Sequence, residues 1–169
     1  AIVDAIAIFI FDSAYNGSSP TSQNYLAKYE IIVSKNGNTG QSTQGEDAQY
    51  IYLKGTGNNN PMSAVCKINN GTSIAERTNM TRGLTLILIN RLTLEIYSQT
   101  SYDVYGDSVS AGETQCANLA TAINNASSSY FVCVVSYDAV RWTNDLIAAL
   151  QSCGSKGIDD TTAYRVPFA

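Results

Sequence analysis

The chain has 169 residues, of which 44% are hydrophobic and only 14% are charged, with a net charge of −4. It contains no histidine, which excludes Ser-His-Asp and Cys-His catalysis and histidine-ligated metals. Acidic and basic residues form no run of either sign, so the basic stripe required for nucleic-acid binding is missing. The low charge predicts a neutral surface of Asn, Ser, Thr, Gln and Tyr. We expect a non-enzymatic extracellular protein that needs no cofactor.

The N-terminal stretch is apolar and is followed by a turn-rich segment. Residues 1–12, AIVDAIAIFIFD, have apolar residues on both faces, which predicts a strand buried on both sides. This run is shorter than the roughly 20 residues that a membrane span needs. Residues 13–24 contain Asn16-Gly17 and Ser19-Pro20 and predict a linker. We expect a mature chain whose signal has been removed, with one domain over residues 25–169.

Within this domain, β-rich runs separated by turn signals predict a series of strands. They cover residues 25–35, 48–55, 62–69, 83–90, 92–98 and 130–137, and residues 162–169 begin as a further strand. Asn36-Gly37 and Asn70-Gly71 are hairpin signals, and a tight hairpin is expected around Asn90-Arg91. The continuous apolar run YFVCVVSY at 130–137 is typical of a central strand.

Two helices are predicted in the C-terminal half. Ser110 and Glu113 form a capping box for the first helix. The second helix is expected from about Ala139 to Ser152, with Asp138 as its N-cap and Gly154 just after its end. Two stripes fall on the buried faces: Cys116, Leu119, Ala120 and Ile123, then Trp142, Leu146, Ala149 and Leu150.

The element order therefore predicts an α+β fold. We expect an antiparallel β-sandwich flanked by two helices, with an extended N-terminal β-strand arm.

Four cysteines occur without C-x-x-C spacing: Cys66, Cys116, Cys133 and Cys153. This spacing argues against a zinc site, and the sequence offers no other metal site. The even count favours two disulfides in one of three connectivities, and four reduced, buried cysteines are the alternative. Four sequons predict N-glycosylation if the source organism glycosylates: Asn16, Asn70, Asn79 and Asn125.

Several short motifs follow one another in the second half of the chain. They are Arg82-Gly83-Leu84, Tyr102-Asp103-Val104-Tyr105-Gly106-Asp107, Val134-Val135-Ser136-Tyr137-Asp138 with Asn144-Asp145, Cys153-Gly154-Ser155, and Tyr164-Arg165. In this order they resemble the interleukin-like EMT inducer (ILEI, or PANDER-like) domain family over residues 81–168. The resemblance implies two antiparallel sheets lined by helices, and a secreted protein without catalysis of its own.

The resemblance also implies a sugar-binding site. In the stem domain of a protein O-mannose glycosyltransferase, the family's domain binds sugar through two arginines and an aspartate. The matching positions here are Arg82, Asp138 and Arg165. Paired, charge-assisted hydrogen bonds to sugar hydroxyls suit these residue types. The alternative is structural, with Asp138 as an N-cap and both arginines in an ion-pair network with it.

The two ends of the domain suggest a polymer. The family continues with a further strand where this chain has Val166-Pro167-Phe168-Ala169, so we expect an open sheet edge. Residues 1–12 are a candidate donor strand for that edge in a neighbouring copy. Seven apolar side chains would be buried: Ile2, Val3, Ile6, Ile8, Phe9, Ile10 and Phe11.

The sequence thus predicts a subunit of an extracellular filament or surface appendage, a homopolymer assembled by strand insertion. Two alternatives remain open. The N-terminal strand can pair with its own sheet, and the protein can be a monomeric secreted ILEI-like or carbohydrate-binding module, such as a viral tail-fibre or surface-protein domain.

Overall fold

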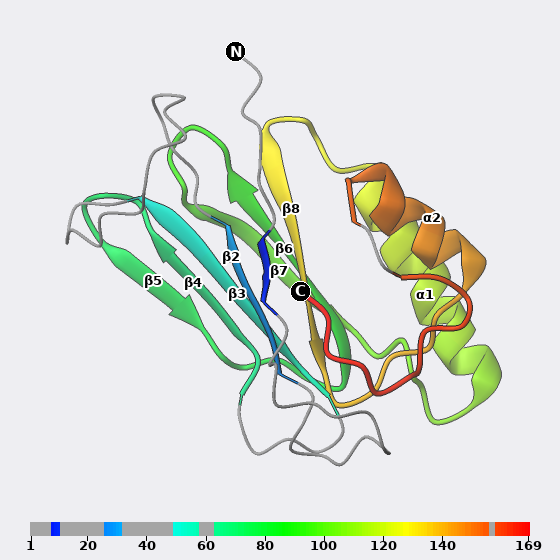
Figure 1. Ribbon diagram of the computed structural model, residues 1–169. Coiled ribbons are helices and arrows are strands. Elements are labelled where there is room, and N and C mark those ends of the chain that lie inside the picture. Colours follow the sequence, from blue (N-terminus) through cyan, green and yellow to red (C-terminus); the bar gives the residue numbers. More distant parts are fainter. Residues whose placement is uncertain (1–7, 11–25, 32–48, 58–62, 156–157) are drawn as a thin grey trace.

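The computed structural model of the chain describes residues 8–10, 26–31, 49–57, 63–155 and 158–169 (Figure 1). The elements are, in order, β1 (Ile8–Ile10), β2 (Leu26–Ile31), β3 (Tyr50–Thr56), β4 (Val65–Asn69), β5 (Ile74–Arg77), β6 (Gly83–Asn90), β7 (Ile96–Tyr102), α1 (Val109–Asn124), β8 (Tyr130–Tyr137) and α2 (Asn144–Ser152). Two antiparallel sheets and two helices make this an α+β fold, as the sequence predicts.

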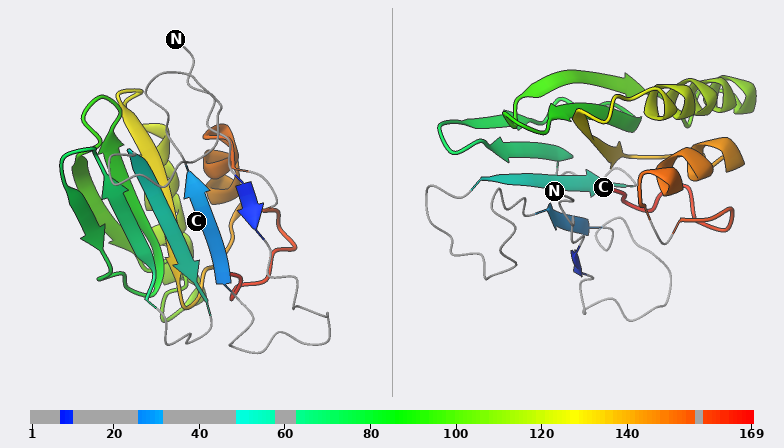
Figure 2. Two further views of the ribbon diagram at one scale, coloured as in Figure 1. Left: turned by 60° about the vertical axis from the view of Figure 1, so that its left-hand side comes forward. Right: turned by 90° about the horizontal axis from the view of Figure 1, so that it is seen from above.

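The first sheet has the strand order β1-β2-β3-β4-β5, and the second has the order β7-β6-β8. β6 is the centre of the second sheet, where Leu84 is opposite Tyr102 on one side and Ser136 on the other. Figures 1 and 2 show the two helices beside the second sheet, with β3, β4 and β5 on its other side. The second sheet is therefore the middle layer of the described structure.

The middle position of the second sheet explains its apolar sequence. Neighbouring residues of a strand point to opposite faces, so a strand buried on both faces has no polar alternation. Leu84, Leu86 and Val134 pack with seven helix residues, namely Cys116, Leu119, Ala120, Ile123, Leu146, Ala149 and Leu150. On the other face, Ile87, Ile89 and Val135 pack with residues of the first sheet, namely Ile51, Leu53, Cys66 and Ile68.

The predicted strands agree with the structure most closely in this middle layer. β6 and β8 have the predicted bounds, and β2, β3 and β4 overlap their predicted runs. β5 was not predicted, because IAER carries too little apolar character for a strand signal. The Asn36-Gly37 turn lies outside the described residues.

The turn after β6 is longer than the predicted tight hairpin, and β7 begins at Ile96 instead of Leu92. The Asn90 side-chain oxygen accepts the backbone N–H groups of Leu92 at 2.8 Å and Thr93 at 3.1 Å. Leu94 then adopts a φ of 56° and is buried. These local hydrogen bonds compete with the sheet ladder, so the strand starts later than its apolar pattern suggests.

Helix α1 starts two residues earlier than predicted. Ser108, not Ser110, is the N-cap, and its hydroxyl accepts the N–H of Ala111 at 3.2 Å. The capping-box prediction for Ser110 and Glu113 is therefore wrong. The predicted buried stripe of this helix is confirmed, since all four of its residues lie in the core.

Helix α2 starts later than predicted, with Thr143 as its N-cap. Asp138 is not an N-cap, because it has a φ of 62° and the chain turns there at the end of β8. The next residues run beside the C-terminal segment instead, and the N–H of Val140 donates to the carbonyl of Tyr164 at 2.7 Å. This tertiary contact displaces the helix start by several residues.

The end of α2 is as predicted. Gly154 has a φ of 97°, a conformation that other residues adopt at a cost. Its N–H donates to the carbonyl of Gln151 at 2.9 Å, and the N–H of Ser155 donates to the carbonyl of Leu150 at 3.1 Å. This pair of bonds is a Schellman motif.

The C-terminal segment, residues 158–169, contains no strand, which corrects the prediction for residues 162–169. It is held instead by Ser136, which donates its N–H to the Phe168 carbonyl at 2.8 Å and accepts the Phe168 N–H at its hydroxyl at 2.7 Å. The same hydroxyl donates to the Thr56 carbonyl at 3.0 Å. One buried serine therefore joins the segment to the end of β3 and to β8.

Of the predicted donor strand, only Ile8, Phe9 and Ile10 lie among the described residues. They form β1, which pairs antiparallel with β2 of the same chain. This is the arrangement in which the strand joins its own sheet. The other four donor residues lie outside the described residues, as does the predicted linker 13–24: Ile2, Val3, Ile6 and Phe11.

Candidate functional site

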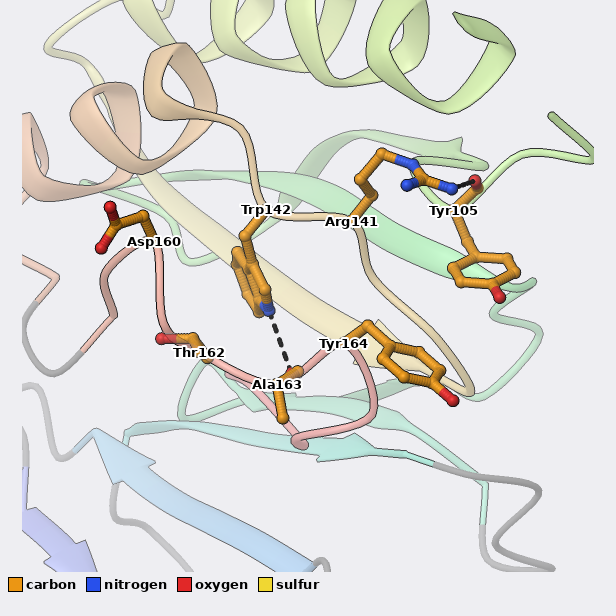
Figure 3. Close-up of a pocket in the computed structure, with 7 residues that line it drawn as sticks. All are labelled: Tyr105, Arg141, Trp142, Asp160, Thr162, Ala163 and Tyr164. Atoms are coloured by element: carbon orange, nitrogen blue, oxygen red, sulfur yellow. Dashed lines mark hydrogen bonds between the residues drawn. The ribbon is translucent and has the colours of Figure 1, made fainter. Parts of the chain in front are cut away.

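A pocket of about 360 Å³ opens where the loop before α1, the segment before α2 and the C-terminal segment meet (Figure 3). Seven residues line it: Tyr105, Arg141, Trp142, Asp160, Thr162, Ala163 and Tyr164. Figure 3 shows Arg141 and the two tyrosines on one side of Trp142, and Asp160 with Thr162 on the other. The pocket therefore combines flat aromatic surfaces with both hydrogen-bond donors and acceptors.

Two stacked tyrosines form one wall of this pocket. The ring centroids of Tyr105 and Tyr164 are 5.8 Å apart, with 26° between the ring planes. The guanidinium groups of Arg82 and Arg141 lie 5.6 Å and 5.4 Å from the Tyr105 ring, and that of Arg165 lies 5.2 Å from the Tyr164 ring. Guanidinium groups at these distances are attracted by the aromatic faces. The wall is thus aromatic and flanked by positive charge.

Trp142 and Arg141 connect the wall to the rest of the site. The indole N–H of Trp142 donates to the Ala163 carbonyl at 3.2 Å, which holds the C-terminal segment at the rim. Arg141 donates from Nη2 to the Tyr105 carbonyl at 3.3 Å, while its Nε is buried without a hydrogen-bond partner in the structure. A buried donor without a partner is costly, so Arg141 is an unusual residue of this site.

Arg82 is committed to two carboxylates. It binds Asp103 through two hydrogen bonds, of 2.9 Å from Nε and 2.6 Å from Nη2, and Asp107 through a third of 2.6 Å. These bonds hold the pKa of the Asp103 carboxyl below its ordinary value and raise the pKa of Arg82. The cluster ties the start of β6 to the loop that carries Tyr105.

The lowered pKa of Asp103 predicts acid sensitivity. A carboxyl whose pKa is lower in the folded state stabilises the fold above its unfolded pKa of about 3.9, and this stabilisation is lost as the pH falls through the folded pKa. Asp103 is partly exposed, so we expect D103N to cost only about 1 kcal/mol at neutral pH. The difference from the parent should shrink as the pH falls below the unfolded pKa of about 3.9, and it should vanish once the folded-state carboxyl is protonated as well, in urea unfolding followed by circular dichroism.

The matched control is Glu95→Gln, which alters an exposed carboxylate in the turn before β7. It should leave stability unchanged at every pH. A D103N deficit that stays constant from pH 7 to pH 2 would contradict the assignment of this ion pair.

The three residues that the resemblance implies for sugar binding gather at one end of the second sheet. Gly83 is opposite Tyr137, so Arg82 and Asp138 lie just beyond the paired ends of the adjacent strands β6 and β8. Oδ1 of Asp138 is buried without a hydrogen-bond partner. Arg82 does not form the alternative ion-pair network with Asp138, because the carboxylate partners of Arg82 are Asp103 and Asp107.

None of the three lines the pocket itself, but two of them touch its wall. Arg82 contacts Tyr105 and Arg165 contacts Tyr164. No sequence pattern by itself indicated the pocket residues as a binding site, Tyr105, Arg141 and Tyr164 included. The signal for the tyrosines was present, since both stand inside the quoted motifs beside charged residues. Arg141 had no signal, because it falls inside the region predicted as helix.

Of the other predicted site residues that the structure describes, none lines the pocket. All four cysteines are free thiols, which departs from the predicted pair of disulfides. Asn70 uses its side-chain oxygen to accept the N–H groups of Thr72 and Ser73, whereas Asn79 and Asn125 are exposed. Asn16 lies outside the described residues.

The described residues also bear on metal binding and on membrane insertion. No group of three or more Cys, Asp or Glu side chains there is arranged to hold a metal ion. In the same part of the chain, neither helix has the length and apolar character to cross a bilayer.

A family model described as Interleukin-like EMT inducer matches residues 82–169. No curated protein and no solved structure matches the chain significantly. The matched stretch runs from Arg82 through the middle sheet and both helices, and it contains every residue of the pocket. It covers just over half of the sequence, and the chain therefore belongs to the interleukin-like EMT inducer family.

Proposed function

We propose that this protein is a secreted, monomeric, non-enzymatic module that binds a saccharide in the pocket between Tyr105, Trp142 and Tyr164. The observation that carries the proposal is the stacked tyrosine wall with Arg141 beside it, whose Nε is buried without a partner. Family membership supports secretion in general terms. The low charge of the chain supports it as well.

The chemistry of the pocket suits a sugar. Aromatic faces pack against the C–H faces of pyranose rings, and a planar guanidinium donates paired hydrogen bonds to neighbouring oxygens. Asp160 supplies an acceptor for hydroxyl groups on the other side of Trp142. The volume of about 360 Å³ falls at the lower end of the range for small-ligand sites, about 300–1,000 Å³.

The same inventory argues against catalysis. The chain has no histidine to act as a general base. Asp160, the carboxylate of the pocket, is exposed at the surface, and no second carboxylate lines the pocket to form a catalytic pair with it. Binding without turnover is the use that these side chains support.

Binding is tested with a glycan array, followed by calorimetry on the best hit. R141A should weaken binding at least about tenfold, because a charge-assisted hydrogen bond contributes about 1.5–3 kcal/mol. Y164A should weaken it similarly by removing half of the aromatic wall. Retention of full affinity by both variants, or an array without hits, would refute the saccharide site.

The chain offers matched controls for both changes. Arg91 lies over the Phe131 ring at 4.4 Å, and Tyr97 stacks on Tyr130 at 4.5 Å, both at the opposite end of the second sheet. R91A and Y97A remove the same kinds of contact and should leave affinity unchanged. They separate a local effect on the pocket from a general effect on the fold.

The monomeric state is part of this proposal. Pairing of β1 with β2 of the same chain favours it over the filament subunit that the sequence first suggests. Light scattering of the purified protein should give the mass of one chain, 18.1 kDa. Filaments in electron micrographs that disappear on deletion of residues 1–12 would restore the polymer hypothesis instead.

A further inference from the structure

Two buried cysteines lie in the core between the two sheets. Cys66 of β4 has no exposed surface, and Cys133 of β8 is 3% exposed. Both belong to the hydrophobic cluster that the first sheet and the second sheet share. Burial raises the pKa of the Cys133 thiol, and the nearby Cys66 raises it further. The two thiols thus enter one shared core from opposite sheets.

The other two cysteines are not available to either of them. Cys116 packs on the opposite face of the second sheet, in the helix cluster, and its thiol donates to the Arg141 carbonyl at 3.2 Å. Cys153 is exposed at the end of α2. Cys116 lies beside the start of α2, and Cys153 lies at its end. The ten residue steps from Thr143 to Cys153 rise by about 1.5 Å each, so about 15 Å separates these two ends. Cys66 and Cys133 are therefore the two cysteines that share one core cluster.

We propose that Cys66 and Cys133 form a disulfide that joins the two sheets through their common core. The oxidant is a small-molecule disulfide such as oxidised glutathione. One cysteine thiolate attacks it and releases one glutathione thiolate, and the second cysteine thiolate attacks the mixed disulfide and releases another. The two protons lost by the cysteines are taken up by the two glutathione thiolates, so two thiols are oxidised and one disulfide is reduced.

The bond forms while the chain is folding. Burial raises the pKa of Cys66 to about 12 and also raises the pKa of Cys133, so the folded core contains almost no thiolate at neutral pH. Oxidation therefore has to precede closure of the two sheets, as it does for a protein that folds in an oxidising compartment. This inference does not depend on the saccharide site.

The disulfide would also join two parts of the sequence. Cys66 belongs to the strands that precede the matched family segment, and Cys133 belongs to that segment. It would close a loop of about 67 residues and restrict the unfolded chain accordingly. The bond would make the first sheet a permanent part of the domain.

The test is to refold the full chain with reduced and oxidised glutathione and to count free thiols after denaturation. We expect two thiols per chain instead of four. Chymotryptic mapping without reductant should then recover a linked pair containing Cys66 and Cys133. This protease cuts after Tyr130 and Phe131 and so separates Cys133 from Cys116. Four free thiols, or a bridge that contains Cys116 or Cys153, would overturn the proposal.

A second measurement does not depend on recovering peptides. Reductant should lower the Tm of the oxidised parent by about 10 °C and leave the Tm of the C66A/C133A double variant unchanged. The control is Cys153→Ala, whose thiol is exposed, and it should respond to reductant as the parent does. A parent protein whose Tm is the same with and without reductant would contradict the bond.

Discussion

Replacement of Gly55 by alanine is expected to destabilise the fold by about 3 kcal/mol or more, the upper end of overpacking effects. A Cβ atom at this position would overlap the backbone carbonyl of Phe168. The obstacle is backbone and not a flexible side chain, so either β3 or the C-terminal segment has to move. That movement would break the hydrogen bonds of Phe168 to the buried Ser136. Urea unfolding measured by circular dichroism gives the free-energy difference.

Gly154→Ala is the appropriate comparison for this change. Gly154 has a positive φ of 97° but open space where a Cβ would stand. Its replacement costs about 1 kcal/mol, from the backbone conformation alone. If G55A were no more destabilising than G154A, the close approach of the C-terminal segment to β3 would be wrong.

Truncation of Phe168 to alanine is expected to cost about 3–5 kcal/mol. The ring is 8% exposed, belongs to the cluster that the helices share with the second sheet, and meets the Trp142 ring edge-on at 5.6 Å. Its removal leaves a cavity beneath Trp142, whose indole forms part of the pocket. We therefore expect F168A to shift the tryptophan fluorescence as well as the urea midpoint.

Leu92→Ala provides the control for this truncation, because Leu92 is 86% exposed in the turn after β6. Its effect on stability should stay within about 0.5 kcal/mol. A small effect of F168A, comparable with that of L92A, would show that the C-terminal segment does not pack on the core in solution.

The parts of the fold that the sequence predicted are those determined by local patterns. The continuous apolar runs of β6 and β8 require burial on both faces wherever they lie, and their bounds were predicted correctly. The stripe from Cys116 to Ile123 has helical spacing, and Gly154 has the residue type that a helix end requires. None of these inferences needed knowledge of a distant partner.

The parts that were missed depend on contacts distant in sequence. Asp138 has the residue type of an N-cap, but the pairing of Val140 with Tyr164 holds the following residues out of the helix. Residues 162–169 have the pattern of a strand, but Ser136 binds Phe168 through a side chain, which no periodicity reveals. The predicted sugar-binding residues came only from the family resemblance, and the aromatic wall beside two of them became visible once Tyr105 and Tyr164 were brought together.

Burial of the second sheet on both faces restricts the substitutions that its strands can accept during evolution. Along most of β3 and β4 buried residues alternate with half-buried ones, and β5 has no buried residue, so about half of the positions in these strands can drift among polar residues. In β6 nearly every position is constrained, by the helices on one side and the first sheet on the other. The slowest-changing stretch should therefore begin with β6 at Gly83, one residue after the start of the family match at Arg82. Relatives with quite different first sheets are expected to share this middle layer.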